Sequence, residues 1–209
     1  MDNQTFIENL GNFSLADALL KRRSIRIFKK SPVPKKCVDT AIHAALLAPS
    51  PHGTFPWRFC ILNNKKSKTK LGKSMGKKFL EDMKSEGISK KIRESRYEKS
   101  LLLIQNSPLI VLVSIDFSKM DTYKDKKKQE NENMMAEHSL GAALQNLMIA
   151  FAAQGISSVW RCAPLFCPDI TRVSLDLPKK WFPRAMILAG FPKTKPSKKK
   201  SISPKVVIR

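Results

Sequence analysis

Apolar and polar positions divide the chain into segments that follow either a strand pattern or a helix pattern. Arg58–Asn63 and Leu109–Asp116 are short, almost continuous apolar runs, which are typical of strands buried in a sheet. Asn133–Gln154 is much longer and becomes apolar almost all round after Ser139, so it predicts a largely buried helix. Gly155 is a fitting C-terminal stop for that helix. Together these patterns predict an α+β fold.

Shorter helices are predicted near the N-terminus. The segment Ser14–Lys21 is amphipathic, and its first residue and Asp17 have the spacing of a capping box. A further short helix is predicted over Gln4–Leu10. A helix rich in small residues is predicted over about Lys35–Leu47, and Pro49 follows its end.

Two stretches are strongly charged. Lys65–Arg96 is rich in lysine and predicts a helical region that breaks near Gly87. Residues 118–133 predict a mobile charged loop between the second strand and the long helix.

The composition is that of one globular domain. The chain has 209 residues, of which 42% are hydrophobic, and this length suffices to bury a proper core. No apolar run approaches the roughly 20 residues needed to cross a bilayer. The segment Met1–Phe6 lacks the basic start and apolar core of a secretory signal. We therefore expect a cytoplasmic protein with no membrane partner.

Positive charge dominates the sequence, with 39 Lys and Arg against 17 Asp and Glu and a formal net charge of +22. A surplus of this size suggests a polyanionic partner. The lysines are nevertheless spread along the chain, and no helix-turn-helix, zinc-finger or aromatic RNA-binding signature accompanies them. We expect a solvated basic surface and no specific nucleic acid. The alternative is a basic, non-enzymatic protein that binds nucleic acid or another polyanion.

The cysteines predict no metal site. Cys162 and Cys167 are five positions apart, which is not the spacing of a zinc knuckle, and no second pair or suitably spaced histidines exist. Cys37 and Cys60 fall in helix and strand patterns and are expected to be small buried apolar groups. Free thiols fit a reducing compartment.

A basic segment, Arg22–Phe28, follows the helix predicted over Ser14–Lys21. Arginine presents a planar, permanently charged fork of donors that matches phosphate oxygens. In an extended strand Arg22, Ser24 and Arg26 would share one face, as a phosphate cradle requires. The alternative interpretation is a basic helix terminus that complements the helix dipole.

Four segments in this order resemble the nitroreductase superfamily of flavin enzymes. The basic segment is the first, and the second is the turn-rich run from Pro49 to the Pro-Trp pair at Trp57. The third, Gly141–Trp160, is similar to the central helix of that family and the strand after it. The fourth, Leu177–Pro192, is similar to its C-terminal strand. The resemblance covers most of the chain, roughly from Ser14 to Val207.

This resemblance implies a nitroreductase-like fold, with a mostly antiparallel central sheet flanked by helices, in a two-fold homodimer that binds FMN. It implies one domain over 1–209, with 64–107 as a variable helical cover and 193–209 as a C-terminal extension. A reduced nicotinamide or deazaflavin donor would pass hydride to the flavin, and an electron-poor acceptor would then take the electrons. The resemblance implies no particular catalytic residue.

The resemblance also implies which residues hold the flavin. The basic strand would grip its phosphate and ribityl chain, the Pro-Ser loop of the partner subunit would touch its ring, and backbone after the central helix would lie against the ring. A basic pair in the C-terminal extension would close on the phosphate. In that order, these residues are Arg22, Arg23, Ser24 and Arg26; Pro49, Ser50 and Pro51; Trp160, Cys162 and Ala163; and Lys198 and Lys200.

Two finer expectations accompany the resemblance. The loop 51–54 and the segment Ala163–Asp169 resemble the branch that occurs fused to the deazaflavin-coenzyme glutamate ligase, which implies a part in maturing that coenzyme. The long helix is expected to lie at the dimer interface, because its apolar side chains are too many to face one modest core. These side chains are Leu140, Leu144, Leu147, Met148 and Phe151.

Overall fold

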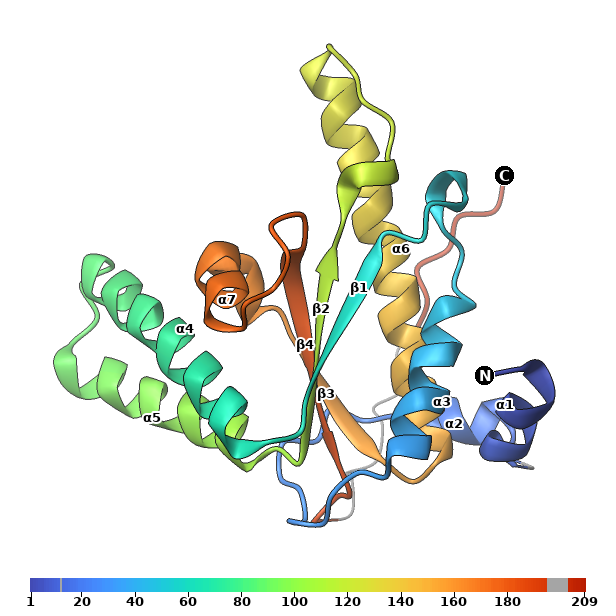
Figure 1. Ribbon diagram of the computed structural model, residues 1–209, viewed down its shortest axis with the longest axis horizontal. Coiled ribbons are helices and arrows are strands. Elements are labelled where there is room, and N and C mark those ends of the chain that lie inside the picture. Colours follow the sequence, from blue (N-terminus) through green and yellow to red (C-terminus); the bar gives the residue numbers. More distant parts are fainter. Residues whose placement is uncertain (12, 195–202) are drawn as a thin grey trace.

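The computed structural model describes residues 1–11, 13–194 and 203–209 (Figure 1). Its centre is a four-stranded sheet in the order β1-β2-β4-β3, in which every neighbouring pair is antiparallel. The strands are β1 (Trp57–Leu62), β2 (Leu109–Ile115), β3 (Ser157–Arg161) and β4 (Phe182–Gly190). This sheet confirms the predicted α+β class.

Helices cover both faces of the sheet (Figure 1). On one face α3 (Lys35–Leu46) and α6 (Lys126–Ala153) pack against alternate residues of β2, among them Val111 and Val113. On the other face α4 (Lys65–Ser85) and α5 (Lys90–Asn106) pack against Ile110 and Leu112. Because side chains alternate along a strand, the fully buried β2 supplies both cores. The shorter helices are α1 (Asn3–Leu10), α2 (Leu15–Lys21) and α7 (Pro168–Ser174).

The apolar side chains of α6 fill the core of a single chain, and the expectation that they could not was wrong. None of the five is more than 4% exposed, and all belong to the core between α3 and the sheet: Leu140, Leu144, Leu147, Met148 and Phe151. The helix is apolar on opposite sides because α3 covers one side and the sheet covers the other. These residues therefore provide no argument for a dimer.

The long helix also begins earlier than its sequence pattern predicted. Residues 118–133 are not one mobile loop, because α6 starts at Lys126. Asp125 caps the helix by accepting the N–H of Lys128 at 2.8 Å, and this cap supports a first turn that is otherwise exposed and highly charged. The 3-10 turn Phe117–Lys119 joins β2 to the segment before the cap.

Elsewhere the predicted boundaries are close to the observed ones. Ser14 caps α2 by accepting the N–H of Asp17 at 3.0 Å. The break between α4 and α5 falls at Gly87, whose φ of 72° favours glycine. Helix α5 continues to Asn106, beyond the predicted end of the charged region, and α7 was not predicted. No helix in the described ranges has the length and apolarity needed to span a membrane.

Helices α4 and α5 pack closely through two glycines. A Cβ atom on Gly72 would lie 2.9 Å from Leu101 Cδ1, and one on Gly76 would overlap the ring of Tyr97. Both glycines belong to the wall of the cavity described below, so this close packing also shapes the cavity.

Replacing Gly76 by valine should therefore lower the free energy of unfolding by roughly 1–3 kcal/mol, because overpacking forces the two helices apart. Thermal unfolding followed by circular dichroism measures the loss. The matched control is Lys77→Val, an exposed neighbour on α4 that carries the same β-branched cost without the clash. Equal effects of the two substitutions would contradict the close packing of α4 on α5.

Candidate active site

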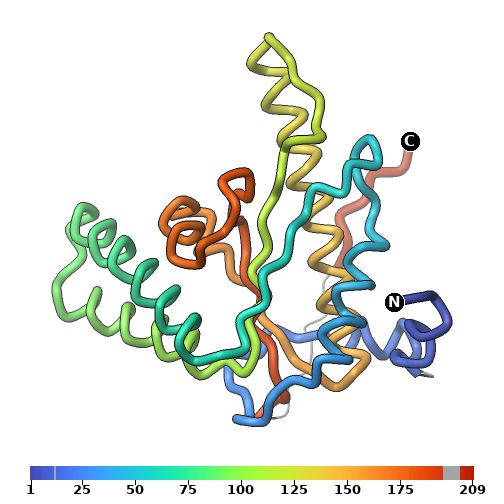
Figure 2. Tube along the Cα trace, viewed as in Figure 1, coloured from blue at the N-terminus to red at the C-terminus, as the bar shows by residue number. Residues whose placement is uncertain are grey.

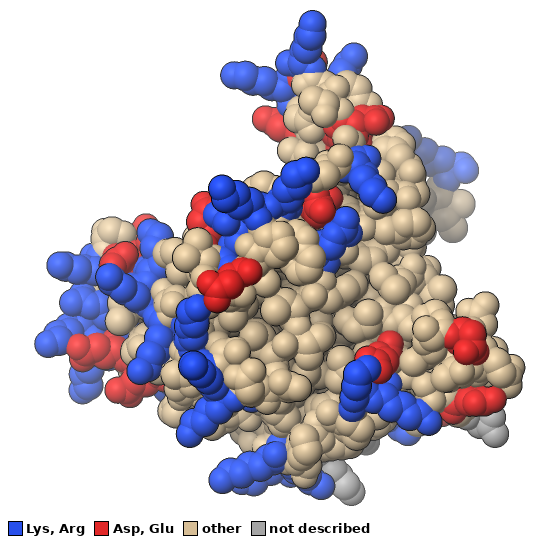
Figure 3. Space-filling view, in the orientation of Figure 1, with Lys and Arg blue, Asp and Glu red and all other residues tan. Residues whose placement is uncertain are grey.

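A cavity of about 910 Å³ lies between α4, α5 and the C-terminal end of β3. Its apolar wall includes Met75, Met83, Ile104 and Phe166. Its polar and strand-derived wall includes Arg26, Arg96, Ser100, Trp160, Arg161, Cys162 and Ala163. Figure 3 shows that Lys and Arg side chains gather over the α4–α5 pair that forms the outer side of this cavity.

The basic segment runs along the edge of the sheet. Ser24 forms an isolated parallel bridge with Ser158 of β3, and the N–H of Ile25 donates to the Ser158 carbonyl at 3.1 Å. Further on, Phe28 bridges Pro192 in the antiparallel sense, beyond the end of β4. The segment predicted as a strand is thus extended but makes only two single bridges among the described residues. It pairs first with β3, which is short, and then with the residues that follow β4.

Within this segment, Arg26 lines the cavity. Arg22 is the C-cap of α2, and its N–H donates to the carbonyl of Ala18 at 2.9 Å. Arg22 and Arg23 are half-buried, whereas Ser24 and Arg26 are exposed. The segment therefore runs beside β3 and brings the positive charge of Arg26 to the cavity.

The cavity has the donor chemistry expected for an anionic cofactor. Burial lowers the pKa of the Arg161 guanidinium, and the nearby charge of Arg26 lowers it further. Neither arginine forms an ion pair with a carboxylate in the part of the chain that the structure describes. The Arg26 guanidinium, which has no acidic partner there, fits an anionic group such as FMN, and the guanidinium of Arg161 adds a second positive charge to the same space.

The three predicted residues after the central helix all line the cavity. Trp160 lies on β3 and packs against the α6 side of the core, Cys162 is exposed, and Ala163 begins a 3-10 turn. The sheet thus ends at the cavity with its backbone turning past it. The described cysteines are free thiols, and burial raises the pKa of the Cys167 thiol on the same wall.

The Pro-Ser loop lies elsewhere in the chain. The chain that follows α3 lies on the opposite side of the sheet from α4 and α5 (Figure 2). Pro49, Ser50 and Pro51 belong to this segment, and none of them lines the cavity. Ser50 Oγ accepts the N–H of Phe55 at 2.8 Å, so the loop has a defined shape of its own. A single chain therefore brings together Arg26, Trp160, Cys162 and Ala163, but not the predicted loop residues.

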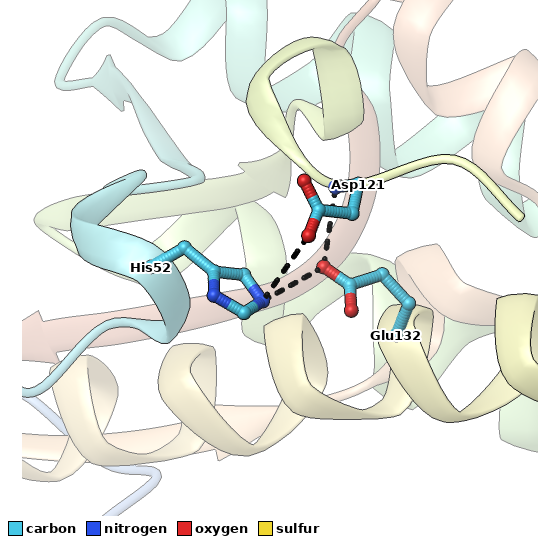
Figure 4. Close-up of side chains that lie close together, drawn as sticks. All are labelled: His52, Asp121 and Glu132. Atoms are coloured by element: carbon cyan, nitrogen blue, oxygen red, sulfur yellow. Dashed lines mark hydrogen bonds and ion pairs between the residues drawn. The ribbon is translucent and has the colours of Figure 1, made fainter.

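A cluster of His52, Asp121 and Glu132 joins the Pro-Ser loop to α6 (Figure 4). His52, with a φ of 51°, places Nε2 3.3 Å from Oε1 of the buried Glu132 and 3.9 Å from Oδ2 of Asp121. The same Glu132 oxygen accepts the N–H of Asp121 at 3.2 Å. The sequence placed His52 in this loop, but Glu132 fell within the supposed mobile loop, so its pairing with His52 was not foreseen.

Two predicted residues, Lys198 and Lys200, lie outside the described residues. Conversely, the sequence interpretation missed Arg161, Arg96 and Ser100. Arg161 could have been found from strand alternation, because it follows Trp160 on β3 and must point to the opposite face. The two residues on α5 carried no comparable signal.

Comparison with known sequences places the chain among flavoenzyme relatives. A model of the nitroreductase family matches residues 19–191. The putative NAD(P)H nitroreductase YfhC of Bacillus subtilis is 27% identical over 194 residues, which cover 89% of this chain and 88% of that protein. Iodotyrosine deiodinase 1 of Rattus norvegicus is 29% identical over 190 residues, which cover 84% of this chain and 61% of that protein.

Solved structures share the fold. A BluB-like flavoprotein from Clostridium difficile matches with a TM-score of 0.74 and 23% identity, covering 94% of this chain and 99% of that one. Oxidized iodotyrosine deiodinase bound to FMN and 3-iodo-L-tyrosine matches with a TM-score of 0.69 and 22% identity, covering 94% and 98%. The model of the nitroreductase family matches residues 19–191, which are most of the chain, and the solved structures share its fold. The chain therefore belongs to the nitroreductase family.

Proposed function

We propose that this protein is an FMN-dependent oxidoreductase that moves a hydride from a reduced nicotinamide to an electron-poor acceptor. The observation that carries the proposal is the meeting of the basic segment with the end of β3, where Arg26 and Trp160–Ala163 line one largely apolar cavity. The relatives named NAD(P)H nitroreductase and the FMN-bound deiodinase support it.

The residues have distinct roles in this proposal. Arg22, Arg23 and Ser24 bind the phosphate and ribityl chain, and Arg26 favours negative charge near the ring. The backbone of Trp160, Cys162 and Ala163 orients the ring, while the apolar side chains of α4 and α5 exclude water. FMN itself, when bound, supplies the capacity to accept and donate a hydride. In this proposal Lys198 and Lys200, from the C-terminal extension, complete the phosphate site.

We further propose that the complete site belongs to a homodimer. Pro49, Ser50 and Pro51 lie away from the cavity of their own chain, yet their loop is fixed against α6 by the His52–Glu132 pair. A loop that lies away from the cavity of its own chain in this way can reach the cavity of a second copy. The loop would then cover the ring of a flavin held by its partner.

The donor is proposed to be a reduced nicotinamide, because a relative that spans most of this chain is named for NAD(P)H. A role in maturing a deazaflavin coenzyme rests only on the loop 51–54 and the segment Ala163–Asp169. We retain reduced deazaflavin as the alternative donor.

The test is to purify the protein with added FMN and to record its visible absorbance without oxygen. The proposal expects a bound flavin that bleaches on addition of NADH or NADPH and recovers its colour with a nitroaromatic acceptor. Bleaching by reduced deazaflavin, but not by NADH or NADPH, would mean that deazaflavin is the donor instead of nicotinamide. A colourless protein that ignores FMN but binds DNA near physiological salt would favour the polyanion-binding alternative.

A further inference from the structure

Arg161 ends β3 at the cavity. It pairs with Met186 of β4, and strand alternation sets its direction. Val159, two residues before it, packs into the core on the α4 side, whereas Trp160 packs on the α6 side. Arg161 therefore faces α4 and α5, and it belongs to the cavity wall that these helices complete.

The charge of Arg161 is not balanced within the described residues. Its Nη2 donates to Ser100 Oγ on α5 at 3.5 Å, and the charge of Arg26 acts on it as a like charge. Burial lowers the pKa of this guanidinium, because its charged form is less well solvated there than in water. A half-buried cation without an acidic partner is costly, and an anionic ligand removes that cost.

The other charged groups of the cavity leave the same imbalance. Asp82 on α4 is paired with Lys78, so its carboxylate is already occupied. Glu86 remains as an acid in the wall, against the guanidinium groups of Arg26, Arg96 and Arg161. The cavity therefore favours a ligand that carries a negative charge on an apolar body, because methionine, phenylalanine and isoleucine side chains form much of the remaining wall.

The FMN phosphate does not account for this charge. Ser24, in the proposed phosphate grip, is level with Ser158 on β3, and Arg161 lies three residues further along the strand. At the rise of a β-strand this separation is roughly 10 Å. A phosphate held at Ser24 would therefore lie beside the start of β3, whereas Arg161 lines the cavity at the end of that strand.

We propose that Arg161 binds a carboxylate of the acceptor that shares the cavity with FMN, and so selects small aromatic acids over neutral aromatics. This inference rests on the proposed function, because it assigns the substrate class of the same site. Ser100 holds the guanidinium from α5, and Arg96 adds positive charge from the same helix. The phosphates of the nicotinamide donor are the other source of negative charge.

The test compares two acceptors of the same size, para-nitrobenzoate and para-nitrobenzamide, with the FMN-loaded protein. Arg161→Gln should lower kcat/KM for the nitrobenzoate roughly 10- to 100-fold, through KM, as expected for loss of a charged hydrogen bond. The nitrobenzamide should change by less than about twofold. Arg161→Lys should recover part of the effect, and Lys77→Gln, on the exposed face of α4, is the matched control.

Two binding measurements separate the outcomes. Nitrobenzoate binding to the oxidised protein, followed by the change in flavin absorbance, should weaken by the same factor in Arg161→Gln, while FMN affinity stays unchanged. Weaker FMN binding, a raised KM for NADH or NADPH, or equal losses for both acceptors would each overturn the assignment. A wild-type protein that binds no FMN would instead overturn the proposed function.

Discussion

Leu144→Glu should leave the protein largely unfolded. Leu144 is fully buried between α3, α6 and the sheet, and a carboxylate there has no partner and no access to water. The effective penalty for burying an ion is several kcal/mol, comparable with the whole stability of a typical domain, about 5–15 kcal/mol. The milder Leu144→Ala should cost roughly 2–5 kcal/mol, which denaturant unfolding can measure.

The control for this substitution is Met134→Glu, at a position on the same helix that is 50% exposed. It should change stability by less than about 0.5 kcal/mol. A folded Leu144→Glu variant that had merely become monomeric would contradict the account, because Leu144 would then face a partner subunit instead of the core of its own chain.

Arg26→Ala and Arg22→Ala should each weaken FMN binding by about 1.5–3 kcal/mol, the scale of a hydrogen bond to a charged group. This loss corresponds to a roughly 10- to 150-fold higher Kd. Quenching of flavin fluorescence during titration of the FMN-free protein measures it. Riboflavin, which lacks the phosphate, should lose little affinity in Arg22→Ala, because that arginine is assigned to the phosphate.

Two lysines serve as controls for the arginines. Lys35, with a side chain 87% exposed and paired with Asp39, and Lys126, at the exposed start of α6, should be replaceable by alanine with almost no effect on FMN. Equal losses at all four positions would mean that the basic segment is only part of a generally positive surface.

The sequence predicted the buried strands and the first helix caps well because their signals are local. The unbroken apolar run of β2 has one interpretation, a strand covered on both faces, and Ser14 and Asp17 form a cap from residues three apart. The segments Arg22–Arg26 and Trp160–Ala163 were likewise identified from short stretches of consecutive residues. The structure brings Arg26 and the latter segment to one cavity.

What the sequence could not show depends on tertiary packing. The apolar residues of α6 suggested a dimer interface because the pattern alone cannot reveal that α3 covers the outer side of the helix. Glu132 lies in a charged stretch that was predicted to be a loop. Asp125 caps α6 seven residues earlier, so Glu132 lies inside the helix, where it contacts His52. Arg161 and Arg96 meet at the cavity from elements more than sixty positions apart.

A crystal structure of the protein grown with FMN tests the central claim most directly. The account predicts a flavin whose phosphate contacts Arg22 and Ser24, whose ring lies at Arg26 and the Trp160–Ala163 backbone, and over which Pro49–Pro51 of a second copy close. A flavin bound away from the end of β3, or a ring covered only by residues of its own chain, would contradict it.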